Sequence, residues 1–145
     1  MEDLSLHVMD IVENSIRGGA SEISVSLNVV EETRTLVLVI EDNGKGMSAE
    51  EIERSLDPFY TSKEEKRVGL GLPLFQQAAI ESEGGMTVES TPGRGTRIRA
   101  EFGLDHPDMK PVGDMEGTIS LLKVFHREVA FTFDWKHTES SGQGG

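Results

Sequence analysis

The chain has 145 residues, 36% of them hydrophobic and 28% charged, which suffices for the core of one globular domain. Its 26 acidic and 14 basic residues leave a net charge of −12, which argues against a nucleic-acid partner because phosphate backbones are also negative. The sequence has no cysteine, no apolar run long enough to cross a bilayer and no signal peptide at its start, and we therefore expect a cytoplasmic protein without a membrane span.

A helix is predicted near the N-terminus, over residues 2–17. Its apolar residues follow the i, i+4, i+7, i+8 spacing of an amphipathic helix at Leu4, Val8, Ile11 and Val12. Gly18 or Gly19 would end the helix, since glycine adopts the backbone conformation of a C-cap at little cost. His7 falls inside this helix and is interpreted as a structural or surface residue.

Two strands and a short helix are predicted next. Apolar and polar residues alternate over 23–30, which indicates a strand with one buried face. A second strand is predicted over 34–42, which contains the continuous apolar run of residues 36–40, as in a central strand. The sequence EETR between them indicates a hairpin turn. Ser48 is a suitable N-cap and Glu51 its capping-box partner, which together predict a helix over 49–56.

Residues 57–71 show no periodicity and are predicted to form a loop. Lys63, Lys66 and Arg67 cluster there, on an otherwise acidic chain. This cluster is either an ordinary solvated loop or a positive rim at which an anion binds.

A helix and two strands follow the loop. The helix is predicted over 72–84 and would end at the glycine pair of residues 84 and 85. The sequence GMTVES predicts a strand over 85–90. The turn TPGRG leads into a second strand over 96–104, where Ile98, Ala100 and Phe102 alternate with polar residues.

The composition changes after residue 104, and we divide the chain into a domain of residues 1–104 and an extension of residues 105–145. The extension is predicted to contain a linker over 105–114, a helix over 115–125, a strand over 129–135 and a disordered tail over 137–145. It would be either a partner-docking element or a C-terminal cap. The order of elements predicts an α+β fold, a two-layer sandwich with helices on one face of a mixed, mostly antiparallel sheet.

The predicted first helix carries a candidate metal site. Asp10 and Asn14 lie one turn apart and share a face, with Glu13 close to it. A carboxylate and a carboxamide suit magnesium, which prefers hard oxygen ligands and retains several waters. The alternative is a polar helix face without a ligand.

Two glycine-rich segments indicate a second type of site. In EDNGKGM, residues 41–47, Asp42 stands at the end of a buried strand, where a carboxylate can accept a hydrogen bond from an exocyclic amine. In VGLGL, residues 68–72, two glycines open a helix, which lets backbone N–H groups approach phosphate oxygens. Either segment alone is also compatible with a simple turn.

Together and in this order, the segments resemble the GHKL superfamily of gyrase, heat-shock chaperone, histidine kinase and mismatch-repair ATPases. HVMDIVENSIRGGA is similar to its asparagine box, EDNGKGM to its first glycine box, DPFYTSK to its phenylalanine box and VGLGLPL to its second glycine box. TPGRGTRIRAEF is similar to its terminal glycine-threonine strand. The resemblance covers roughly residues 5–103 and implies a Bergerat-type ATP-binding fold with ATP and Mg²⁺ as ligands.

The resemblance also implies roles for individual residues. Asn14 would hold the magnesium ion, Asp42 would accept from the adenine amino group, and Met47 would pack on the base. Thr96 would support Asp42 and a water molecule at the base. The remaining residues implied in nucleotide binding are Gly44, Gly46, Phe59, Thr61, Lys63, Gly69, Leu70 and Gly71.

Within the superfamily, the phrase DPFYTSK and a short lid from Thr61 to Arg67 are most similar to histidine kinases. Arg17, three residues after Asn14, matches a basic residue that these kinases place on the phosphates. ENSIRGGA instead resembles the mismatch-repair and gyrase phrase, in which a catalytic glutamate precedes the asparagine by four positions. Asp10 occupies that position here and is a candidate general base with a side chain shorter by one methylene.

The resemblance leaves three functions open. The first is an ATP-dependent protein kinase that transfers phosphate in trans during signal transduction. We find no phosphoacceptor hairpin before the first helix, so the acceptor histidine would lie on a partner protein. The second is a nucleotide-gated protein-binding module of the anti-sigma-factor type, and the third is a slow ATPase that uses Asp10.

Overall fold

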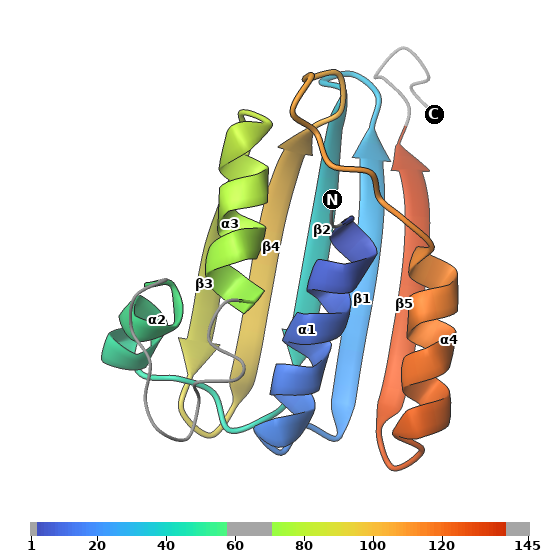
Figure 1. Cartoon of the computed structure of the whole chain (residues 1–145). Helices are drawn as coiled ribbons and strands as arrows, with labels where there is room; N and C mark the ends of the chain where they lie inside the picture. The colour runs from blue at the N-terminus through green and yellow to red at the C-terminus, as the bar shows by residue number, and fades with distance from the viewer. Residues whose placement is uncertain (1–2, 58–70, 139–145) are drawn as a thin grey trace.

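The computed structural model describes residues 3–57 and 71–138 of the chain. The described residues form four helices and five strands (Figure 1), which in chain order are α1 (Leu4–Arg17), β1 (Glu22–Val30), β2 (Thr35–Asp42), α2 (Ala49–Ser55), α3 (Gly71–Glu81), β3 (Gly85–Thr91), β4 (Gly95–Gly103), α4 (Met115–Phe125) and β5 (Ala130–Thr138).

The five strands form one mixed sheet in the order β3-β4-β2-β1-β5. The pairs β1–β2, β2–β4 and β3–β4 are antiparallel, and β5 runs parallel to β1. Figure 1 shows α1, α3 and α4 on one face of the sheet, with α1 between the other two. The predicted α+β sandwich, with helices on one face of a mostly antiparallel sheet, is therefore confirmed.

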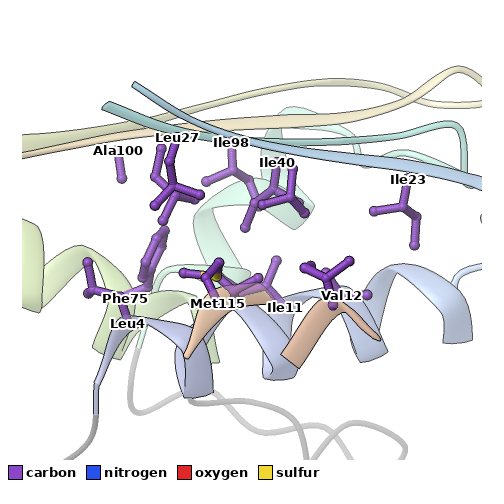
Figure 2. Close-up of a cluster of buried hydrophobic side chains, with 14 of the residues drawn as sticks. Leu4, Ile11, Val12, Ile23, Leu27, Ile40, Phe75, Ile98, Ala100 and Met115 are labelled. Atoms are coloured by element: carbon purple, nitrogen blue, oxygen red, sulfur yellow. The ribbon is translucent and has the colours of Figure 1, made fainter. Parts of the chain in front are cut away.

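The core lies between the helices and this face of the sheet, where Figure 2 shows side chains of both layers pointing toward one another. The predicted helical face of α1 is buried, since Leu4, Val8 and Val12 are fully inaccessible and Ile11 is nearly so. Alternate residues of β1, β2 and β4 supply the other side of the core because successive strand side chains point to opposite faces. His7 is also buried in this layer, with its ring centroid 5.8 Å from that of Phe75.

Capping side chains determine where α1 and α2 begin. Asp3 is the N-cap of α1, where its Oδ1 accepts from the backbone N–H of Leu6 at 3.1 Å. The predicted capping box of α2 is present, since the Ser48 hydroxyl accepts from the Glu51 N–H and the Glu51 carboxylate accepts from the Ser48 N–H. The hydrogen bond from the Ser48 N–H to the Glu51 carboxylate is the main cause that holds the pKa of Glu51 below its ordinary value.

The end of α3 differs from its predicted position. The helix ends at Glu81, and the first residue in the left-handed region is Glu83, with φ of 69°. Gly84 is required for another reason, because a Cβ there would overlap the carbonyl oxygen of Glu101 on β4. Of the predicted loop over 57–71, residues 58–70 lie outside the described residues.

The C-terminal strand is longer than predicted. Residues 137–145 are predicted to be a disordered tail, and this is wrong for His137 and Thr138, which pair with Val29 and Val30 of β1. The polar side chains of these two residues do not predict a strand, and their strand conformation follows from the pairing with β1. The rest of that tail lies outside the described residues.

Residues after 104 are tied to the rest of the molecule at several points. The carbonyl groups of Pro111 and Val112 accept hydrogen bonds from the first N–H groups of α1, at Leu4 and Ser5. Met115, Ile119 and Leu122 of α4 are buried in the same core as α1 and α3. The described part of the extension therefore adds a strand to the sheet and a helix to the helical layer.

Candidate functional site

Asp42 stands at the end of β2, on the sheet face that the helices cover. Its Oδ2 accepts a hydrogen bond from the hydroxyl of Ser15 on α1 at 2.7 Å, and its Oδ1 accepts from the backbone N–H of Gly44 at 2.8 Å. The side chain is half-buried. The two hydrogen bonds fix the carboxylate in one orientation and leave lone pairs on both oxygens for a further donor.

Near Asp42, the backbone approaches neighbouring segments so closely at two positions that only glycine fits. Gly46 has φ of 73°, and a Cβ on it would overlap the carbonyl oxygen of Thr91 at the end of β3. Gly95 has φ of 119°, and a Cβ on it would overlap the carbonyl oxygen of Asp42 itself. These glycines let the segments that follow β2 and β3 pack together at the strand ends.

A small polar network lies beside Asp42. Thr96 is the partner of Asp42 in the β2–β4 ladder, and its hydroxyl shares a hydrogen bond of 2.8 Å with the hydroxyl of Ser90. Ser90 also accepts from the backbone N–H of Met47 at 2.7 Å. The network therefore connects the first glycine segment to β3 and β4, and it places Thr96 next to the predicted adenine-binding aspartate.

The exposed side of α1 carries the next group of predicted residues. Asn14 is half-buried, and its Oδ1 accepts from Arg17 Nη2 at 3.2 Å. Asp10 lies one turn before Asn14 and is exposed. A Cβ on Gly71, the first residue of α3, would lie 3.7 Å from Asp10 Oδ2. The N-terminus of α3 and the polar side of α1 are thus brought together.

Glu13, which is also close to the predicted metal site in sequence, points elsewhere. Its carboxylate lies 3.2 Å from Nε2 of His126, the C-cap residue of α4. Among the described residues, no three His, Cys, Asp or Glu side chains gather as a metal site. A magnesium ion at Asn14 would therefore take its other ligands from water and from a bound phosphate, as this ion commonly does.

A cavity of about 650 Å³ touches Asp42 and Thr96 but lies mostly on the other side of the sheet. Its lining includes Ser24, Glu41 and Arg97, which alternate along their strands with the buried residues and therefore face away from the helices. The candidate site lies on the helical face, where α1, α3 and the strand ends meet.

Several predicted site residues lie outside the described residues, namely Phe59, Thr61, Lys63, Gly69 and Leu70. The structure places Asp10 beside Gly71 and joins Asn14 to Arg17 on the same helix. It places Asp42, Gly44, Gly46, Met47 and Thr96 in a second group. Ser15 joins the two groups, because it follows Asn14 on α1 and bonds Asp42.

Two residues of the site are missed by the sequence analysis. Ser15 and Ser90 lie 27 and 6 positions from their side-chain partners Asp42 and Thr96. The available signal for Ser15 was its place beside Asn14 on one helix. For Ser90 it was the alternation with Val88, which puts both on the inner face of β3.

Comparison with known proteins agrees with the fold and identifies the family. Residues 2–106 match the family of histidine kinase-, DNA gyrase B- and HSP90-like ATPases. The solved MutL ATPase domain of Aquifex aeolicus, complexed with ADP, superposes with a TM-score of 0.54 at 18% identity, over 93% of this chain and 60% of that one. This structural likeness concerns the fold.

Two curated relatives represent different kinds of protein. The sensor histidine kinase YxdK of Bacillus subtilis is 29% identical over 104 residues, 68% of this chain and 32% of the kinase. The anti-sigma F factor of Thermoanaerobacter sp. is 33% identical over 100 residues, 67% of this chain and 66% of the factor. The chain thus spans about a third of one relative and about two thirds of the other. No described helix has the length and apolar character needed to span a membrane.

The family match extends over most of the chain and includes α1, the first glycine segment and the start of α3, which meet in the structure. The chain belongs to the histidine kinase-, DNA gyrase B- and HSP90-like ATPase family, whose members are ATP-binding domains.

Proposed function

We propose that this chain binds ATP with magnesium and acts on a partner protein in signalling, by phosphotransfer in trans. The observation that carries the proposal is the meeting of three segments that are far apart in sequence. Asp42 is held by Ser15 of α1, and the same helix presents Asp10 to Gly71 at the start of α3. Residues of α1 can therefore contribute to both an adenine site and a phosphate site.

Adenine would be read by Asp42. The carboxylate is acceptor-only when ionised, and Ser15 and Gly44 already orient it. The exocyclic amine of adenine is a donor, so it would complete the set of hydrogen bonds. Guanine presents a carbonyl oxygen at the same ring position, which would face the carboxylate without a proton between them.

The triphosphate would lie between the polar side of α1 and the N-terminus of α3. Asn14 would ligate magnesium through its amide oxygen, and the partial positive charge at the start of α3 favours phosphate oxygens. Arg17 donates to that amide oxygen in the structure, and its guanidinium would neutralise charge on a transferred phosphoryl group.

A nucleotide-gated binding module is the second candidate. It is supported by the anti-sigma F factor, two thirds of which this chain covers, against a third of the sensor kinase. A slow ATPase is the third candidate. It is supported by the exposed Asp10 carboxylate beside Gly71, where it could take a proton from an attacking water.

The first experiment measures the fate of γ-labelled ATP with the purified chain, alone and with cell extract. Label transferred to another protein supports the kinase, phosphate release by the chain alone supports the ATPase, and tight binding without either supports the gated module. The absence of any ATP binding would contradict all three.

Two variants then separate the mechanisms. In an ATPase, Asp10→Asn should abolish phosphate release and spare ATP affinity, because only the capacity to take a proton is lost. In a kinase, Arg17→Ala should lower transfer more than Asp10→Asn does. Glu32→Gln is the matched control, since Glu32 is an exposed carboxylate in the β1–β2 turn, at the other end of the strands. We expect Arg17→Ala to have the larger effect.

A further inference from the structure

The sheet has an open edge at β5, outside the part of the chain that matches the family. Figure 1 shows β5 at the outer end of the sheet, and no described strand lies beyond it. The strand has nine residues, and Trp135 near its middle keeps 46% of its surface exposed. A long edge of this kind is a template for pairing with another strand.

The outward-facing backbone groups of β5 can be assigned from its bonds to the rest of the sheet. The N–H of Ala130 donates to Ser21, and the carbonyl of Thr138 accepts from Glu31. Even-numbered residues therefore direct their backbone groups toward β1. The backbone groups of the odd-numbered residues point to the open edge, namely those of Phe131, Phe133, Trp135 and His137.

Local charge identifies a second copy of this chain as a suitable occupant. The segment 115–138 contains three acidic and three basic residues, whereas the whole chain has a net charge of −12. The segment of α4 and β5 is therefore neutral overall, and two copies that meet there avoid the repulsion expected from the net charge of the whole chain.

The side chains of β5 also distinguish between antiparallel registers. If the twofold axis passed through Asp134 or through Lys136, each would face its own copy, which is a like-charge pair. An axis at Trp135 places Asp134 of each copy opposite Lys136 of the other, twice. Within one chain these two side chains already lie on the same face, with Lys136 Nζ 3.5 Å from Asp134 Oδ2.

With the twofold axis at Trp135, the outward-facing backbone groups of β5 also form hydrogen bonds. Trp135 would exchange two hydrogen bonds with Trp135 of the second copy, and Phe133 would do so with His137, all residues whose backbone groups face outward. The two indole rings would be cross-strand neighbours on the helical face of the joined sheet. From these observations we infer that the chain forms a twofold-symmetric dimer by antiparallel pairing of β5, centred on Trp135, which joins two five-stranded sheets into one.

Sedimentation of the full chain over a wide concentration range tests the dimer. We expect a species of twice 15.9 kDa that dissociates on dilution. Asp134→Lys should weaken dimerisation about tenfold or more, since both cross-strand pairs become repulsive. The double variant Asp134→Lys with Lys136→Asp should restore it, because the pairs are re-formed with exchanged charges. Asp108→Lys is the control, with an equal charge change on an exposed residue outside α4 and β5.

A cysteine scan gives an independent readout, since the chain has no cysteine of its own. Trp135→Cys should form a disulfide-linked dimer, because Cα atoms of a hydrogen-bonded antiparallel pair are about 5.5 Å apart, within disulfide range. Thr132→Cys should not, since in this register it faces Thr138 of the second copy. A monomer at every concentration, a charge exchange that fails to restore the dimer, or faster cross-linking at residue 132 than at 135 would each overturn the inference. Circular dichroism establishes that each variant is folded.

Discussion

The two carboxylate oxygens of Asp42 accept hydrogen bonds from the Ser15 hydroxyl on α1 and from the Gly44 N–H. The adenine assignment depends on this residue. The position of Asp42 after an apolar strand could be predicted from the sequence, because the run from 36 to 40 indicates a buried strand and EDNG its end. Its support by Ser15 could not, since only the packing of α1 on β2 brings these residues together.

Asp42→Asn should reduce ATP affinity by about 2–4 kcal/mol, because the amide places a donor where the adenine amine needs an acceptor. The folded state should be retained, since the amide oxygen can still accept from Gly44 and the Ser15 hydroxyl can rotate to accept from the amide nitrogen. Calorimetric titration with ATP measures the effect, with Glu41→Gln on the opposite face of β2 as the control. Equal affinities of Asp42→Asn and the wild type would refute the adenine assignment.

Asn14→Ala should make ATP affinity independent of magnesium. The adenine contacts at Asp42 remain, so weak ATP binding should persist, but magnesium should no longer strengthen it. Arg17 loses its hydrogen-bond partner in this variant, and Arg17→Ala serves as the comparison that removes the cation and keeps the amide. ATP titrations with and without magnesium measure the effect. If magnesium tightened binding equally in the variant and the wild type, the ligand would be another residue, with Asp10 the next candidate.

At the scale of elements, α1 depends on contacts at both of its ends. Its N-cap Asp3 accepts from the hydroxyl of Ser5 at 2.7 Å and from the N–H of Leu6, and these bonds hold the pKa of the Asp3 carboxyl below its ordinary value of 3.8. A C-cap at Gly18 ends the helix. Both ends were predictable to within two residues, because caps depend on local sequence.

The lowered pKa of Asp3 predicts a pH dependence of stability with a defined sign. The contribution of the carboxylate should be fully present above the ordinary value of 3.8 and should be lost as the pH falls through the lower value in the folded state. Asp3→Asn should therefore differ from the wild type in free energy of unfolding near neutral pH, and the difference should shrink in acid. Ser5→Ala should reduce this dependence, because the Ser5 hydroxyl is its main cause. A difference that stays constant down to pH 2.5 would contradict the assignment.

At the scale of the whole molecule, α1 lies between α3 and α4, and all three bury apolar residues against one sheet. The elements that carry the candidate site therefore share a core with the helix of the C-terminal extension. Phe75 of α3 and Leu122 of α4 are both almost completely buried. This arrangement favours one cooperative unit that includes residues 115–138.

Leu122→Ala should lower the free energy of unfolding by about 2–5 kcal/mol, as expected for a leucine removed from a packed core. The loss should appear in the same transition that Phe75→Ala lowers, because both side chains belong to one cluster. Leu6→Ala is the matched control, since Leu6 is 50% exposed and its truncation removes little buried surface. Denaturant titration followed by far-ultraviolet circular dichroism measures both. Two separate transitions, of which Leu122→Ala affects only one, would favour an extension that folds independently.

The sequence by itself determined the kinds and order of the elements, the buried face of α1 and the segments that carry the candidate ATP site. These features depend on periodicity, capping and glycine placement, which act over a few residues. Only the tertiary structure decided that Ser15 supports Asp42, that Gly71 faces Asp10, and that His137 and Thr138 belong to a strand. Each of these depends on contacts between residues far apart in the chain, and such contacts are set by how helices and strands pack together rather than by the residues beside them.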